Sequence, residues 1–154
     1  MCKKHQVEMV GCSIVKLQCL WKEWLESGMQ SYQDSDYSKA LFYFGNARDV
    51  AFAEFSQAEF TAEAIEHLVV SSLLVARMFR ALDEIEMEQV CLSTTFHYFG
   101  HKIHLKEHEN NLTLAMKTLL DISLHSEYII RATGKSFRDI IFEPKLSRDI
   151  AGMH

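Results

Sequence analysis

Four histidines in the second half of the chain have the residue type and spacing best suited to chemistry. They follow one another at intervals of four, three and four residues, as His97, His101, His104 and His108. On an α-helix, which turns by about 100° per residue, this spacing keeps all four within a sector of roughly 60°. Imidazole is a common zinc ligand, and clustered imidazoles titrate near neutral pH. The row therefore indicates either a metal site or a pH-responsive surface.

A metal ion would need ligands from a second helix, because the ends of the row lie roughly 16 Å apart. Glu63 and His67, four residues apart, belong to the preceding predicted helix. In an antiparallel hairpin, the sequence numbers of two residues that lie opposite each other add up to a constant. This rule places His67 level with His97 and Glu63 level with His101. Such ligands suit zinc, or iron in the interior of a bundle. The candidate metal ligands are thus His97, His101, Glu63 and His67, and the candidate binding-surface residues are His104 and His108.

The same row also has a plain structural interpretation, which the sequence favours. The apolar stripe that contains Ile85, Phe96 and Phe99 points roughly 110–130° away from the histidines on a helical wheel. The histidines then lie on the flank of the helix. On this interpretation they are partly exposed to water and bind neither a metal ion nor a partner.

Helix caps and apolar periodicity predict the elements that would position these residues. A capping box of Ser56 and Glu59 starts the third helix, and Asp83 with Glu86 starts the fourth. Gly134 ends the fifth. Turns near Ser35, Asp83 and Gly134 join the helices into three antiparallel hairpins. Of the six predicted helices, the second carries an apolar stripe from Tyr37 to Ala51. The others cover about residues 13–32, 57–81, 84–108, 110–133 and 136–144.

The composition favours one all-α domain over residues 1–154, with loosely held ends at 1–12 and 145–154. Proline and glycine, which helices tolerate poorly, are scarce: the chain has one proline, Pro144, and 6 glycines. The net charge of −5, with scattered basic residues, argues against a nucleic-acid partner. The longest apolar run, residues 68–76, is too short to cross a membrane.

The sequence predicts a cytoplasmic protein that is not an enzyme. Its four cysteines contain no CxxC pair, which is typical of reduced thiols in the cytosol. There is no G-x-S-x-G motif and no glycine-rich phosphate loop. We therefore expect no cofactor, with zinc or iron at the histidines as the alternative.

The first predicted hairpin resembles a tetratricopeptide repeat (TPR), in a divergent form confined to about residues 24–52. Small residues of this pattern let two helices approach, and large ones fill the space beside them. The matching residues are Trp24, Gly28, Tyr37, Ala40, Phe44 and Ala47. This resemblance implies a right-handed stack of hairpins with elongated helices, and a groove that binds a peptide or a partner helix, as in an adaptor, a regulator or a chaperone.

Three alternatives stay open. The chain could form a closed helical bundle whose first hairpin has converged on the same packing. It could be a metal-binding bundle that uses the histidines. Excess apolar surface on its helices could also serve a structural homodimer or a larger homo-oligomer.

Overall fold

The computed structural model describes residues 13–134. This part of the chain forms six α-helices and two short 3-10 helices, without a strand, so the predicted all-α class is confirmed. The α-helices are α2 (Ile14–Gln33), α3 (Tyr37–Phe55), α4 (Ala62–Ala81), α5 (Ile85–Gly100), α6 (Glu109–Leu120) and α7 (His125–Thr133), and the 3-10 helices are η1 (Lys106–His108) and η2 (Ile122–Leu124).

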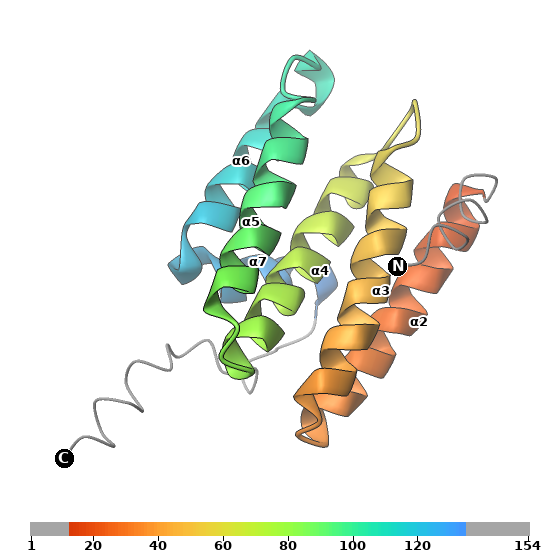
Figure 1. The fold of residues 1–154 in the computed structure, drawn as a ribbon. Helices are drawn as coiled ribbons and strands as arrows, with labels where there is room; N and C mark the ends of the chain where they lie inside the picture. The colour runs from red at the N-terminus through yellow and green to blue at the C-terminus, as the bar shows by residue number, and fades with distance from the viewer. Residues whose placement is uncertain (1–12, 135–154) are drawn as a thin grey trace.

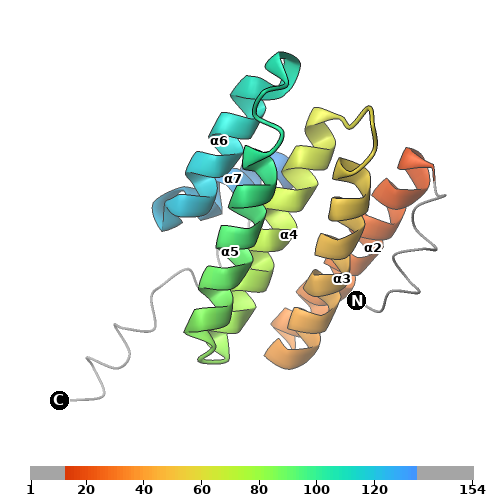
Figure 2. The ribbon, with the colours of Figure 1, turned by 45° about the horizontal axis from the view of Figure 1, so that its top comes forward.

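Helices α2 to α6 follow one another side by side, each roughly antiparallel to the one before it (Figure 1). Helix α7 lies behind α4 in both views (Figures 1 and 2). The second helices of the first two hairpins, α3 and α5, therefore run in the same direction. They also touch each other, because Arg48 of α3 donates a hydrogen bond to Thr95 of α5.

The turns predicted near Ser35 and Asp83 are confirmed, and so is the helix end at Gly134. Ser35 and Asp83 have positive φ angles of 58° and 63°, and Gly134 has one of 68°. After each of the first two, the next backbone N–H bonds a carbonyl five residues earlier, as in a Schellman motif. Asp83 is therefore part of a helix end. Its predicted role as the N-cap of the next helix is wrong, since Glu84 holds that position.

The predicted capping box at Ser56 is also wrong. Ser56 ends α3, and its hydroxyl donates to the Phe52 carbonyl at 2.7 Å. Helix α4 begins five residues later than predicted, at Ala62, where the Thr61 side chain accepts from the Ala64 N–H. A threonine directly before a regular helix satisfies one of its unpaired N–H groups, so Thr61 is the true start signal.

The tight packing predicted for the first hairpin is present. A Cβ atom built on Gly28 of α2 would lie 2.5 Å from the ring of Phe44 on α3. Both residues are buried, as are Ala40 and Ala47. The absence of a side chain at Gly28 therefore lets the two helices nest.

Helix α4 is the centre of the core. Every residue from 67 to 78 is buried, and the helix contacts α3, α5, α6 and α7. Most of these residues are apolar, as expected for a helix covered on all sides, and the polar ones among them are His67, Ser71, Ser72 and Arg77. None of the helices in residues 13–134 is long and apolar enough to cross a membrane.

The second half of the chain departs most from the prediction. The predicted fourth helix ends early, at Gly100, and the predicted fifth helix is split into α6 and α7 at Asp121. The Asp121 carboxylate accepts from the N–H of Ser123, an interaction that favours a turn over a continuing helix. The predicted sixth helix, and with it the third hairpin, lies outside the described residues and stays a prediction.

Candidate functional site

The predicted row of histidines does not form, because the helix that would carry it stops too soon. Only His97 lies within α5, and His101 occupies the C-cap position after Gly100. His104 is exposed in the following loop. His108 ends η1, and its ring stacks on Phe60 with the centroids 4.4 Å apart. Glycine has a low helix propensity, and the chain turns back beyond it so that His108 covers part of the core.

The four candidate metal ligands do not converge either. Only Glu63 and His67 approach each other, with 3.6 Å between Oε1 and Nε2. His97 is exposed on α5, with its ring edge-on to Phe96. Within residues 13–134, no three side chains of histidine, cysteine, aspartate or glutamate stand close enough to share a metal ion.

His67 instead joins three helices at what we name the His67 junction: Trp21 of α2, Glu54 of α3 and His67 of α4. The imidazole stacks on the Trp21 ring, with 3.8 Å between centroids and 8° between planes. Its Nδ1 lies 3.0 and 3.1 Å from the two oxygens of Glu54. Nδ1 therefore forms one hydrogen bond that is shared between the two carboxyl oxygens. Both oxygens of Glu54 thus have a hydrogen-bond partner, although the residue is only 1% exposed.

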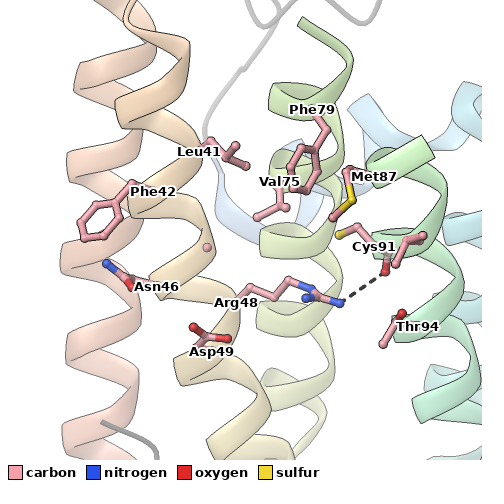
Figure 3. A pocket seen from close by; sticks show the side chains of 12 residues that line it. Leu41, Phe42, Asn46, Arg48, Asp49, Val75, Phe79, Met87, Cys91 and Thr94 are labelled. Carbon is pink, nitrogen blue, oxygen red and sulfur yellow. Dashed lines mark hydrogen bonds between the residues drawn. The ribbon is translucent and has the colours of Figure 1, made fainter. Parts of the chain in front are cut away.

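A groove lies on the other side of α3, between α3 and α5, with α4 as its floor (Figure 3). We name it the α3–α5 groove. Its volume is about 410 Å³. All its lining residues belong to these three helices: Leu41, Phe42, Gly45, Asn46, Arg48, Asp49, Val75, Phe79, Met87, Val90, Cys91 and Thr94.

Arg48 crosses this groove from α3 to the other two helices. Its Nε donates to the hydroxyl of Ser72 on α4 at 3.1 Å. One of its terminal nitrogens, Nη2, donates to the Cys91 carbonyl at 3.3 Å and to the Thr95 hydroxyl at 2.9 Å, both on α5 (Figure 3 shows the bond to Cys91). These acceptors are all uncharged, so the positive charge of Arg48 is held by neutral oxygens.

Two ionisable groups beside Arg48 are partly shielded from water. Burial raises the pKa of the Asp49 carboxyl, although the neighbouring Arg48 charge opposes the shift. Burial also raises the pKa of the Cys91 thiol, which keeps it protonated and poorly nucleophilic. The groove is therefore a place of reduced solvation, without an activated nucleophile at Cys91.

Three apolar side chains at the rim of the groove are unusually exposed. Phe42 on α3 is 62% exposed, and Val90 and Met87 on α5 are 54% and 44% exposed. A single exposed apolar residue is common, but several around one hollow mark an interaction surface. The α3–α5 groove is therefore the best candidate for a functional site in the described part of the chain.

Sequence reasoning did not find this groove, although one signal for it was present. Phe42, Met87 and Val90 fall outside the apolar stripes that bury α3 and α5, on faces that are otherwise polar. Apolar residues that lie outside the buried stripe of a helix are therefore the sequence signal for such a groove. Arg48 itself carried no signal, because its position depends on the spacing between two helices that are distant in sequence.

We also compared the chain with family models, curated proteins and solved structures, and none of them matches it.

Proposed function

We propose that this protein is a non-enzymatic helical module that binds a segment of another protein in the α3–α5 groove. The observation that carries the proposal is the groove with its exposed apolar rim of Phe42, Met87 and Val90. An exposed apolar surface of this kind costs free energy in water, and a bound segment would remove it from water. A cleft with apolar walls and a few polar groups is also the usual form of a binding site.

The proposal includes a divergent TPR-like relationship for the hairpins. Two observations support it: the close Gly28–Phe44 contact inside the first hairpin, and the same direction of α3 and α5 in consecutive hairpins. Stacked hairpins of this kind bind partners through their extended surfaces. The proposed relationship assigns the protein to a class of helical binding modules, and the α3–α5 groove is the proposed binding site.

Selection from a random peptide library displayed on phage tests the proposed function. Wild-type protein is the bait, and the Phe42→Ser/Val90→Ser double variant is the comparison. We expect selected peptides to bind wild type and to lose at least ten-fold in affinity on the double variant. The matched control is Leu120→Ser, which removes a 71% exposed leucine at the end of α6. This control should bind the peptides as wild type does.

Two results would overturn the proposed function. One is that every selected peptide binds the double variant as well as wild type. The other is self-association: a wild-type homodimer in sedimentation equilibrium that the double variant abolishes would assign the rim to a second copy of the chain.

A further inference from the structure

We infer that the segment bound in the α3–α5 groove carries an acidic side chain, a glutamate in preference to an aspartate, which pairs with Arg48. This inference rests on the proposed function and adds the chemistry of the partner: apolar side chains against the rim, and one carboxylate at the groove floor. It assigns to Arg48 the role of a specificity-determining residue.

The first argument is a count of donors. A guanidinium has five N–H groups. In Arg48, the Nε–H and both hydrogens of Nη2 are used by Ser72, Cys91 and Thr95. The second terminal nitrogen, Nη1, has no hydrogen-bond partner in the described part of the chain, and it is not among the buried polar atoms that lack one. Nη1 is therefore not fully buried, and Arg48 lines the groove, so we place its two N–H groups toward the groove.

The second argument is the fixed geometry of the cation. Three hydrogen bonds to α4 and α5 hold the guanidinium, and its central carbon lies 4.8 Å from the centroid of the Phe52 ring. A preorganised donor loses little entropy on binding. Hydrogen bonds between arginine and a carboxylate are also about twice as strong as neutral ones. A carboxylate is thus the acceptor that gains most at this position.

The third argument decides where the carboxylate comes from. Arg48 is bonded to Ser72, a fully buried residue of the floor helix, whereas Phe42 and Val90 stand exposed at the rim. A peptide backbone that rests on the rim must send an acceptor down to the guanidinium. A side chain reaches further from the backbone than a chain-terminal carboxylate does, and glutamate reaches further than aspartate.

Asp49 limits how the acidic group can approach. Its carboxylate lines the same groove and would repel a second negative charge. We therefore expect the ligand carboxylate on the side of Arg48 that faces Thr94 of α5. The neutral Asp49→Asn variant should bind the same peptide more tightly than wild type.

The test uses the strongest groove-dependent peptide from the library selection, synthesised in three forms. They are the parent, a form with glutamine in place of its acidic residue, and a form with an amidated C-terminus. We expect the glutamine form to bind wild-type protein ten- to one-hundred-fold more weakly, in line with the loss of a charged hydrogen bond. The amidated form should bind as the parent does.

An Arg48→Gln variant completes a double-mutant cycle with the peptide. Once Arg48 is gone, the glutamine form should bind as well as the parent does. Circular dichroism shows whether this variant folds. If it does not, the three peptide forms on wild-type protein still decide the question.

The outcomes separate the two proposals. Groove-dependent peptides without an acidic residue, or a glutamine form that binds as tightly as the parent, would overturn this inference and leave the proposed function intact. A loss on amidation alone would assign Arg48 to a chain terminus and would also overturn it. Failure to obtain any groove-dependent peptide would overturn the proposed function itself.

Discussion

Helix α3 places two ionisable side chains, Glu54 and Arg48, against α4, and the surroundings of these two side chains differ. Glu54 is 1% exposed and is closed into the His67 junction, where both of its oxygens face the imidazole. Arg48 is only partly buried and bonds uncharged oxygens, and its Nη1 has no hydrogen-bond partner among residues 13–134. The difference lies in what each group faces: Glu54 faces an imidazole between packed helices, whereas Arg48 lines the groove.

The two regions also differ in what covers them. At the His67 junction, Trp21 of α2 stacks over the imidazole and excludes water. Over the groove, no helix among residues 13–134 occupies the corresponding place, and the apolar rim stays exposed. The first region therefore stabilises the stack of helices, and the second is available to a partner.

Removal of the Glu54 carboxylate should have the largest effect on stability. We expect Glu54→Ala to reduce the free energy of unfolding by about 3–5 kcal/mol, because it removes the hydrogen-bond partner of the buried His67 ring and leaves a cavity beside it. Glu63 is the matched control, since its carboxyl group also lies beside the His67 imidazole but its side chain is 55% exposed. Glu63→Ala should cost at most about 1 kcal/mol. If both variants lose the same free energy of unfolding in urea, the buried contact of Glu54 stabilises the fold no more than the exposed contact of Glu63.

A buried contact between α4 and α7 should make stability depend on pH. Arg77 Nη2 and His125 Nδ1 lie 2.7 Å apart. Burial, reinforced by the Arg77 charge, lowers the pKa of His125 from 6.5 to about 4. Between these values the unfolded state binds the proton and the folded state does not, so stability falls as the pH drops from about 6.5 to 4. The full loss is on the order of 3 kcal/mol.

The variant His125→Asn keeps a hydrogen-bond acceptor for Arg77 but cannot titrate. Urea unfolding at pH 7 and pH 5 should show a smaller pH dependence for this variant than for wild type. The same dependence in both proteins would mean that other groups are responsible.

Two glycines sharpen the contrast between the closed and the open side of α3. A Cβ at Gly28 would meet Phe44 at 2.5 Å, whereas one at Gly45, on the groove side, would meet nothing within 4 Å. We expect Gly28→Ala to cost about 1–3 kcal/mol through overpacking. Gly45→Ala should instead stabilise the helix by up to about 1 kcal/mol. Thermal or urea unfolding measures both, and a shared sign would contradict the contrast.

The smallest expected effect on stability is at the groove rim. Phe42 is 62% exposed, so Phe42→Ser should change the free energy of unfolding by no more than about 0.5 kcal/mol. A loss of 2 kcal/mol or more in urea unfolding would show that Phe42 belongs to the core.

The parts of the fold that local chemistry controls could be predicted from the sequence. The turns inside the first two hairpins, at Ser35 and Asp83, and the small-residue contact at Gly28 follow from polar turn residues, periodicity and side-chain size. The histidine row failed because it assumed that α5 continues beyond Gly100. The groove depends on how far apart α3 and α5 lie, and no local pattern encodes that spacing.

The most direct test of the central claim is a titration of ¹⁵N-labelled protein with a library-selected peptide, followed by NMR. The account predicts that the largest chemical-shift changes fall on residues 41–49 of α3 and 87–94 of α5, and that the Arg48 side-chain signals move with them. Changes confined to the segment from His97 to His108, with the groove unaffected, would contradict it.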